Sequence, residues 1–437
     1  MFETISNRVE HYWVGFALAI LMASWVFTSV LDTMNLLILF VLIAIFLGKG
    51  SLKFTPSLRN WLVIVFLGFF VLGLFHLVFH PVGPSVWLPA IDERIAAVIA
   101  SLGLVLLLLR TQPKEQVVWL SVVGAGIGLM LTFGLEWYRV GDVGLSADYR
   151  FGDVYGTSFL VFGVVSSLMT ALFFAGFTWA IIHRRWGLSG LFLVFIVIAL
   201  MGTFLSGTRG AWLGLPEILL GWALFGYFTF LKHKGLGVKL AVLGAVVLVI
   251  VFLSAVVSEK IEFRAKAAVT DVEQYFVGNP NTSIGLRLVM YEAALNSIKE
   301  KPISGVGFYR VGPEIINRTQ EVFKERFRLD MSGFDSWDVH NQYLQEAMAR
   351  GIPGLIGLLW IQVFALVYFI RSMHSRNIWA VAGTIFVIAS AINMMSYSWL
   401  RFHDGMFFYF MILTLFIYGS EVYGGVHNAL RERGGLR

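Results

Sequence analysis

The longest polar stretch of this otherwise apolar chain, residues 332–351, reads SGFDSWDVHNQYLQEAMARG. It places Asp335 and Asp338 shortly before His340 and Asn341. An imidazole exchanges protons near neutral pH without any perturbation of its pKa. Asp338 and Asn341 surround it with hydrogen-bonding groups that could fix its tautomer. The stretch therefore predicts either a proton-transfer site at His340 or a loop histidine held for structural reasons.

Two arginines occupy positions where a positive charge is unfavourable unless a partner stabilises it. Arg209 lies in LSGTRGAWLGLP between two apolar segments, where Gly207 and Gly210 allow a tight turn. A guanidinium at a membrane face either binds an anion or a carbonyl group or extends to the lipid headgroups. Arg287 opens an expected helix, whose dipole favours negative charge there. It therefore helps to bind a phosphate or forms a surface salt bridge, for which Glu292 is poorly spaced.

Two further polar groups end apolar segments. They are Asp148, Arg150 and Asp153 in DYRFGDVYG, and Arg401, His403 and Asp404 in SWLRFHDGM. Each group either lines an aqueous cavity or marks a helix end. No His-x-x-His or Glu-x-x-His spacing accompanies them, so no metal site is expected.

The composition indicates what surrounds these groups. Of the 437 residues, 58% are hydrophobic and only 14% are charged. A soluble surface needs roughly a quarter to a third charged residues, so most of this surface must face lipid. The net charge of +6 follows from membrane topology, and no nucleic acid partner is expected. Because there is no cysteine, disulfides and thiolate chemistry are excluded.

Apolar runs predict an all-α, polytopic membrane protein with about twelve spans. Each run is close to the ~20 residues with which a helix crosses ~30 Å of hydrocarbon. The runs are 12–30, 34–48, 61–79, 95–109, 117–135, 157–182, 188–206, 211–231, 238–257, 352–370, 377–396 and 405–424.

The distribution of Lys and Arg predicts the orientation of these spans. With the N-terminus inside, the inner connections and tails hold sixteen of these cations. The short outer loops hold five: Arg94, Arg139, Arg150, Arg209 and Arg401. Since cytoplasmic loops are rich in Lys and Arg, both termini are predicted to be cytoplasmic.

One outer connection differs from the rest. Residues 258–350 carry twelve Lys/Arg and thirteen Asp/Glu, a mixture typical of a small folded domain. Residues 285–302 have the periodicity of an amphipathic helix, capped by the preceding NPNTS and closed by Pro302, and a second helix is expected to end at Gly351. The chain is thus predicted to divide into spans at 1–257, a large loop at 258–350, and spans with a tail at 351–437.

Three stretches, in this order and on one predicted face, carry a resemblance to a known family. They are SGTRGAW, SIGLRLVMYEAALNSIKEKPISGVGF and DVHNQYLQEAMARGIPGLIGLL. They resemble the signature segments of the O-antigen ligase family, which includes lipopolysaccharide O-polysaccharide ligases, O-antigen polymerases and bacterial O-oligosaccharyltransferases. The resemblance is densest from about 200 to 370. Asn341 stands where some members have serine, a change that keeps a hydrogen-bonding side chain.

The resemblance implies an inverting, GT-C-like membrane glycosyltransferase that needs no metal or other cofactor. Its site would lie on the periplasmic face of the bacterial inner membrane, among membrane lipids. The implied donor is O-antigen on undecaprenyl pyrophosphate, and the implied acceptor is a sugar hydroxyl of lipid A–core. The family's paired arginines and histidine map onto Arg209, Arg287 and His340 as catalytic residues. The further residues expected to bind substrate are Asp338, Asn341, Arg150 and Arg401.

Three alternatives stay open. An O-antigen polymerase shares the donor and uses a second lipid-linked glycan as acceptor, and a protein O-oligosaccharyltransferase uses a protein. A transporter of lipid-linked glycans belongs to another class and would carry ionisable residues in the middle of the membrane. Here they cluster on the outer face, with Glu217 as the exception.

Overall fold

The computed structural model describes most of the chain from residue 54 onward. The described residues are 54–80, 84–143, 149–152, 158–331, 333–373 and 377–424, together with residues 15, 18–20 and 41. Within them every regular element is a helix and no strand occurs. The prediction of an all-α chain is therefore confirmed for this part of the sequence.

The elements follow one another as short and long helices. They are α3 (Pro56–Val63), η1 (Ile64–Val71), α4 (Leu72–Leu74), η2 (Phe75–Val78), α5 (Pro84–Thr111), α6 (Glu115–Val143), α7 (Phe159–Ile182), α8 (Trp186–Leu205), α9 (Arg209–Leu213), α10 (Leu215–Gly226), η3 (Tyr227–Leu231), α11 (Leu236–Phe276), α12 (Ser283–Glu300), η4 (Phe308–Arg310), α13 (Val311–Val322), η5 (Phe323–Phe327), α14 (Gln342–Ser372), α15 (Ile378–Met394), η7 (Trp399–Arg401) and α16 (His403–Val422).

Eight helical segments among the described residues are long and apolar enough to cross a membrane. They are Pro56–Val78, Arg94–Thr111, Glu115–Gly141, Phe159–Ile182, Trp186–Leu205, Arg209–Leu231, Gln342–Ser372 and Gly405–Val422. The shorter apolar helix Ile378–Met394 matches the eleventh expected span, and the ninth lies within α11. The first two expected spans, 12–30 and 34–48, lie almost entirely outside the described residues. The chain is a polytopic helical protein.

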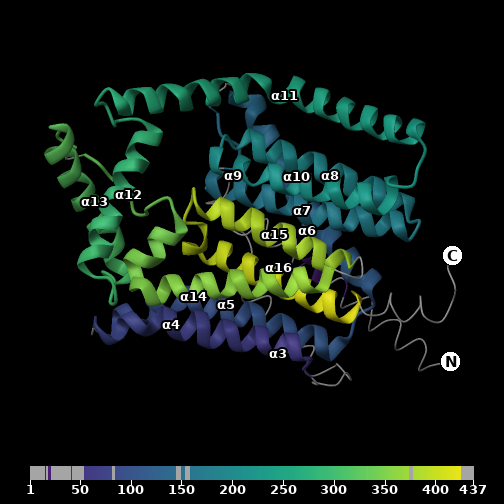
Figure 1. The fold of residues 1–437 in the computed structure, drawn as a ribbon, viewed down its shortest axis with the longest axis horizontal. Coiled ribbons are helices and arrows are strands. Elements are labelled where there is room, and N and C mark those ends of the chain that lie inside the picture. The colour runs from purple at the N-terminus through teal and green to yellow at the C-terminus, as the bar shows by residue number, and fades with distance from the viewer. Residues whose placement is uncertain are drawn as a thin grey trace.

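The long helices form a bundle whose axes run side by side (Figure 1). Its interior is apolar and tightly packed: the indoles of Trp119 and Trp379 stack with centroids 4.1 Å apart. At the crossing of α14 and η1, a Cβ on Gly357 would lie 2.4 Å from the carbonyl oxygen of Gly68. Such close approach needs glycine, so this crossing fixes α14 against the N-terminal part of the bundle.

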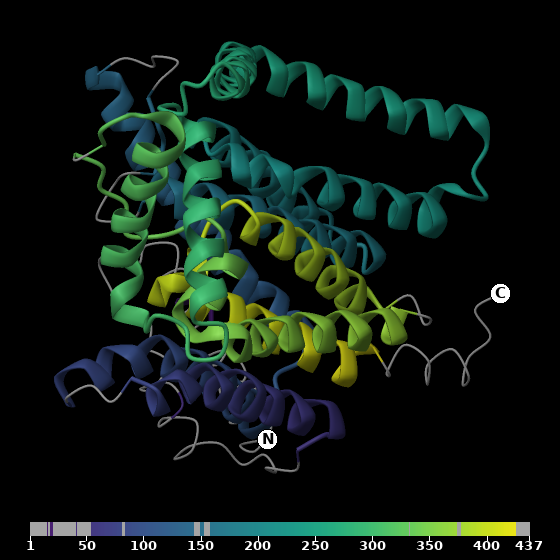
Figure 2. The same cartoon turned by 60° about the vertical axis from the view of Figure 1, so that its left-hand side comes forward.

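Helix α11 is a single helix of 41 residues that runs past the end of its apolar part. It passes through the predicted boundary between span and loop at 257/258 without a break, because residues 258–277 contain neither glycine nor proline. Its two halves point in different directions in Figure 2. The second half therefore brings Arg264 and Asp271 across one end of the bundle, close to the start of α12.

Helices α12 and α13 stand at that same end of the bundle, across the direction of the long helices (Figure 1). They enclose a hydrophobic cluster of their own. Its members are Val289, Met290, Ala293, Ala294, Val306, Val311, Ile315, Val322, Phe323, Val339, Met348 and Ala349. Because Met348 and Ala349 belong to α14, the first turns of that helix are part of this small unit.

Two predicted helix boundaries in this unit are confirmed. The hydroxyl of Thr282 accepts the N–H of Gly285 at 3.1 Å and caps α12. Helix α14 is interrupted at Gly351, which has a φ of 68°. Glycine adopts this value readily, whereas other residues adopt it only with strain. The polar first part of α14 is thus set at an angle to its apolar second part.

Candidate active site

The loop that carries His340 holds this residue in a left-handed backbone conformation. Its φ is 53°, which is uncommon for a residue other than glycine and is kept only where the surroundings enforce it. Its N–H donates to Oδ1 of Asp338 at 2.8 Å, and its carbonyl oxygen accepts from the hydroxyl of Tyr291 at 3.1 Å. The preceding N–H, of Val339, donates to the side-chain oxygen of Gln345 at 3.1 Å. The backbone is therefore fixed from three sides.

The imidazole of His340 lies between a carboxylate and an aromatic ring. Its Nδ1 is 3.0 Å from Oδ1 of Asp338, within ion-pair distance but outside hydrogen-bonding geometry. Its ring stacks on Tyr397, with centroids 6.0 Å apart. Burial lowers the pKa of His340; the Asp338 carboxylate opposes this, and Arg287 and Arg401 add to it. The net lowering favours the neutral imidazole, which can accept a proton.

Arg209 opens the short helix α9, directly after a turn in which Gly207 has a φ of 63°. Its Nη2 donates to Oδ2 of Asp271 in α11 at 3.1 Å. Its Nη1 is buried and has no hydrogen-bond partner among the described residues. Neither interpretation of Arg209 from the sequence predicted that the carboxylate of Asp271 would be its partner. Half of the guanidinium is thus paired within the protein, and the other half lacks an acceptor among the described residues.

Arg287 lies at the second turn of α12 and is half-buried. Within the part of the chain that the structure describes it forms no hydrogen bond or ion pair. Glu292, the nearest candidate along the helix, pairs instead with Arg326 at 2.5 Å. Burial lowers the pKa of Arg287, Tyr291 opposes this, and Arg209 lowers it further. A surface salt bridge is therefore not its task, and a cation desolvated in this way calls for an anion.

Four arginines from different elements come together here. Arg150, whose guanidinium lies 4.4 Å from the ring centroid of Phe159, has its pKa lowered by burial and then by Arg264, Arg209 and Arg287. Arg264 is only 7% exposed and was not among the residues expected from sequence. We call Arg150, Arg209, Arg264 and Arg287 the arginine cluster. A concentration of positive charge of this kind suits a polyanionic ligand.

Two further residues expected at the site have well-defined tasks in the protein itself. The side-chain oxygen of Asn341 accepts the N–H groups of Tyr343 and Leu344 and caps α14, while its amide donates to the carbonyl oxygen of Met395. Arg401, in η7, donates from Nη1 to the carbonyl oxygen of Trp337. Both residues therefore brace the loop that carries His340.

The remaining candidates divide by what the structure describes. Asp335 is exposed. Asp148 and Asp153 lie outside the described residues, and the side chains of His403 and Asp404 do as well. Across the described part of the chain, no group of three or more His, Asp or Glu side chains is placed to hold a metal ion.

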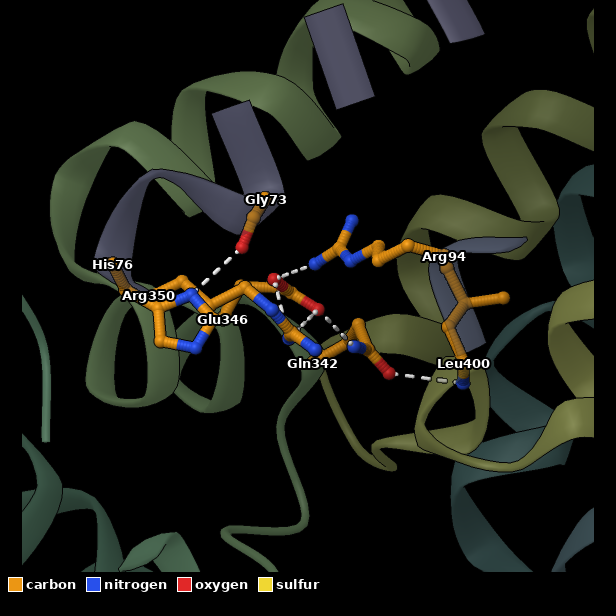
Figure 3. Close-up of polar contacts among 7 residues, drawn as sticks. All are labelled: Gly73, His76, Arg94, Gln342, Glu346, Arg350 and Leu400. Atoms are coloured by element: carbon orange, nitrogen blue, oxygen red, sulfur yellow. Dashed lines mark hydrogen bonds and ion pairs between the residues drawn. The ribbon is translucent and has the colours of Figure 1, made fainter. Parts of the chain in front are cut away.

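A second polar cluster, drawn in Figure 3, joins α5 to the first turns of α14 and is fully buried. Arg94, Glu346 and Arg350 are 0%, 2% and 1% exposed, and the carboxylate of Glu346 pairs with both arginines. The placement of Arg94 in a short outer loop is wrong, because it lies inside the 28-residue helix α5. A hydropathy profile assigns a charged residue to a loop between spans. Here the ion pair between Arg94 and Glu346 of α14 allows the charge to be buried within a helix.

Comparison with known proteins points to one family. The family described as O-Antigen ligase matches residues 194–359. An uncharacterized protein of Haemophilus influenzae is 33% identical over 232 residues, which is 51% of this chain and 55% of that protein. A protein of Escherichia coli K12 named O-antigen ligase is 26% identical over 221 residues, which is 50% of this chain and 46% of that protein. The chain thus spans about half the length of the curated relatives it matches.

The chain is a multi-pass helical membrane protein whose central segment matches the O-antigen ligase family. The resemblance seen in the three motifs is confirmed over residues 194–359. That segment contains Arg209, Arg287 and His340, together with Arg264 and Asp271 from the second half of α11. The matched region therefore includes most of the site described above.

Proposed function

We propose that this protein is a membrane glycosyltransferase of the O-antigen ligase type. It transfers O-polysaccharide from undecaprenyl pyrophosphate to a sugar hydroxyl of lipid A–core, with inversion and without a metal ion. The reaction takes place at the periplasmic face of the inner membrane. The observation that carries the proposal is the placement of the half-buried imidazole of His340, whose pKa is lowered, beside a cluster of arginines with an excess of positive charge.

The leaving group explains the arginines. When the bond between the sugar and the pyrophosphate breaks, negative charge grows on the phosphate oxygens. Guanidinium groups bind such oxygens in pairs of parallel hydrogen bonds and remain charged at all relevant pH values. Arg287 and the unpaired Nη1 of Arg209 supply these donors, and Arg150 and Arg264 add charge around them. Stabilising the charge that develops in the transition state is commonly the largest part of catalysis.

The attacking group explains the histidine. A sugar hydroxyl has a high pKa and must lose its proton as it attacks the anomeric carbon. His340 accepts this proton, a contribution typically of about 10²- to 10⁴-fold. Asp338 lies beside Nδ1 and stabilises the imidazolium that forms. A single in-line displacement inverts the anomeric centre, so the protein supplies no nucleophile.

The test is reconstitution of the purified protein in vesicles with an undecaprenyl-pyrophosphate-linked glycan. Lipid A–core, a second lipid-linked glycan and a pilin-like protein are offered as acceptors in separate reactions, and the lengthened product is identified by mass. Transfer to lipid A–core is expected. Elongation of the lipid-linked glycan alone would replace the ligase with a polymerase, and modification of the protein alone would replace it with an oligosaccharyltransferase. Movement of intact donor across the bilayer without transfer would indicate a transporter.

A further inference from the structure

A buried amide connects the start of α14 with the short helix η7. Gln342, which is 0% exposed, follows directly after the His340–Asn341 pair. Its side-chain oxygen accepts the backbone N–H of Leu400 at 2.9 Å, and its amide donates to Oε1 of Glu346 at 3.3 Å. Figure 3 shows Gln342 lying between these two partners. The side chain thus fixes η7, 58 residues further along the chain, against the first turn of α14.

The second partner of Gln342 is itself held in place by two buried cations. Glu346 accepts from Nη1 of Arg350 at 3.2 Å with each of its oxygens, and Oε2 also accepts from Arg94 in α5. The guanidinium of Arg94 in turn lies 3.6 Å from the ring centroid of Phe69. A carboxylate ordered from two sides presents its oxygen to Gln342 in one position. The amide therefore cannot rotate freely, and its oxygen stays aimed at Leu400.

The element fixed in this way carries a cation that acts on His340. Arg401 follows Leu400 directly, and its guanidinium donates to the carbonyl oxygen of Trp337, three residues before His340. From there it contributes to the lowering of the His340 pKa, after burial and Arg287. The connection therefore runs from α5 through Glu346 and Gln342 to η7 and the His340 loop.

We propose that Gln342 is a positioning residue which, locked by the buried Arg94–Glu346–Arg350 cluster, sets the place of Arg401 beside His340. Gln342 does not face the reacting atoms and acts through Arg401. The inference rests on the proposed function where it is tested by transfer kinetics. Its test by hydrogen exchange depends on the structure alone.

Several charged or titratable groups face His340, and among the residues that the structure describes only one of them, Arg401, is connected to Gln342 in this way. Asp338 belongs to its own loop, Arg287 and Tyr291 come from α12, Arg401 comes from η7, and Tyr397 lies between α15 and η7. If η7 is released, the cation of Arg401 moves away while Asp338 and Arg287 stay. Loss of a nearby cation raises the pKa of a histidine. Because His340 must be neutral to act as a base, a raised pKa keeps it protonated, and therefore inactive, up to a higher pH.

The experiment compares wild-type protein with Gln342→Met, which keeps the length of the side chain and removes both polar atoms. Gln342→Leu serves if the first variant does not fold. The matched control is Asn377→Ala, which removes a buried cap and its bonds to Ser420 at the opposite end of α15, about 25 Å away. Transfer rates are measured between pH 5 and pH 9, and hydrogen exchange of the peptide 396–402 is followed by mass spectrometry.

The Gln342 variant is expected to move the acid limb of kcat/KM to higher pH and to raise exchange at Leu400 by on the order of tenfold, the effect of losing one net hydrogen bond. Asn377→Ala should lower thermal stability without either change. Combined with Arg401→Ala, the Gln342 variant should give no further shift in pH dependence, since both act through one group. An unshifted profile, additive shifts, or unchanged exchange would overturn the inference. Because exchange needs no turnover, it still decides the matter if the wild-type protein transfers no glycan.

Discussion

One carboxylate oxygen of Asp338 contacts His340 twice. Oδ1 accepts the backbone N–H at 2.8 Å and lies 3.0 Å from Nδ1 of the imidazole. The first contact stabilises a left-handed backbone, and the second places negative charge next to the ring. The same side chain therefore sets both the position and the basicity of His340.

Replacing Asp338 with asparagine separates these two effects. The amide oxygen can still accept the backbone N–H, but the negative charge is lost. Asp338 raises the pKa of His340 against the lowering by burial, so its loss lowers that pKa further. The imidazole then stays neutral to a lower pH, and the acid limb of the pH profile of kcat/KM should move to lower pH. The maximal rate should also fall, because a base of lower pKa accepts a proton less readily. An acid limb that moved to higher pH would contradict this account.

Replacing His340 with glutamine should lower the transfer rate by about 10²- to 10⁴-fold while the protein still binds lipid-linked donor. Glutamine has similar size and can hydrogen-bond, but it cannot take a proton. Turnover and donor binding are measured on the same preparation. A variant that retained near-wild-type transfer would show that His340 only orients the acceptor.

Much of this site could be predicted because its signals are local. Thr282 caps α12 three residues before Gly285, and Gly351 breaks α14 where a turn requires positive φ. The three motifs lie within stretches of fewer than thirty residues each. Apolar runs indicated the positions of the long helices, since helices in lipid must satisfy their own backbone hydrogen bonds.

The remainder depended on contacts between distant segments. Asp271 pairs with Arg209 across 62 residues, and no local pattern announces it. Arg264 was overlooked because hydropathy ends the ninth span at 257, whereas the helix continues to Phe276. A helix ends where its backbone is broken, here near Gly278 with a φ of 90°, rather than where its side chains become polar. Arg264 and Asp271, seven residues apart on one helix face, were the available signal.

Removing the guanidinium of Arg287 should lower kcat/KM by about 10- to 100-fold, the effect of losing about 1.5–3 kcal/mol of charged hydrogen bonding to phosphate. Lysine should restore only part of the activity, because it cannot form two parallel bonds. Arg318→Ala is the matched control, since Arg318 lies on α13 and pairs with Glu300, Glu314 and Glu321. Equal rates for Arg287→Ala and Arg318→Ala would remove Arg287 from the site.

Arg264 offers a test of the wider arginine cluster. Arg264→Gln should raise KM for the lipid-linked donor more than it changes kcat, if the side chain adds positive charge around the pyrophosphate without contacting the breaking bond. The effect should shrink as ionic strength rises, because salt screens charges that are not in direct contact. An effect confined to kcat, or one independent of salt, would instead assign Arg264 to the support of α11 alone.

Removal of divalent metal with a chelator should leave transfer unchanged. Guanidinium groups stabilise the leaving pyrophosphate in the proposed reaction, a task that a divalent cation performs in many other phosphate-releasing enzymes. Rates are compared before and after treatment of the vesicles with excess chelator, with addition of Mg²⁺ as the control. A loss of transfer that Mg²⁺ restored would show that the arginines do not suffice.

The buried cluster of Arg94, Glu346 and Arg350 predicts an unusual pattern of stability. Glu346→Gln leaves two guanidiniums inside the protein without their carboxylate and should destabilise it by about 3–5 kcal/mol. The triple variant Arg94→Met, Glu346→Leu and Arg350→Met removes all the charges and should be less destabilised, because no uncompensated ion stays buried. Thermal unfolding in one detergent ranks wild type, Glu346→Gln and the triple variant.

The triple variant should nevertheless transfer glycan more slowly than wild type, since Gln342 loses the carboxylate that orients it. If the triple variant were the least stable of the three, the attraction within the cluster would exceed the cost of removing its three charges from water.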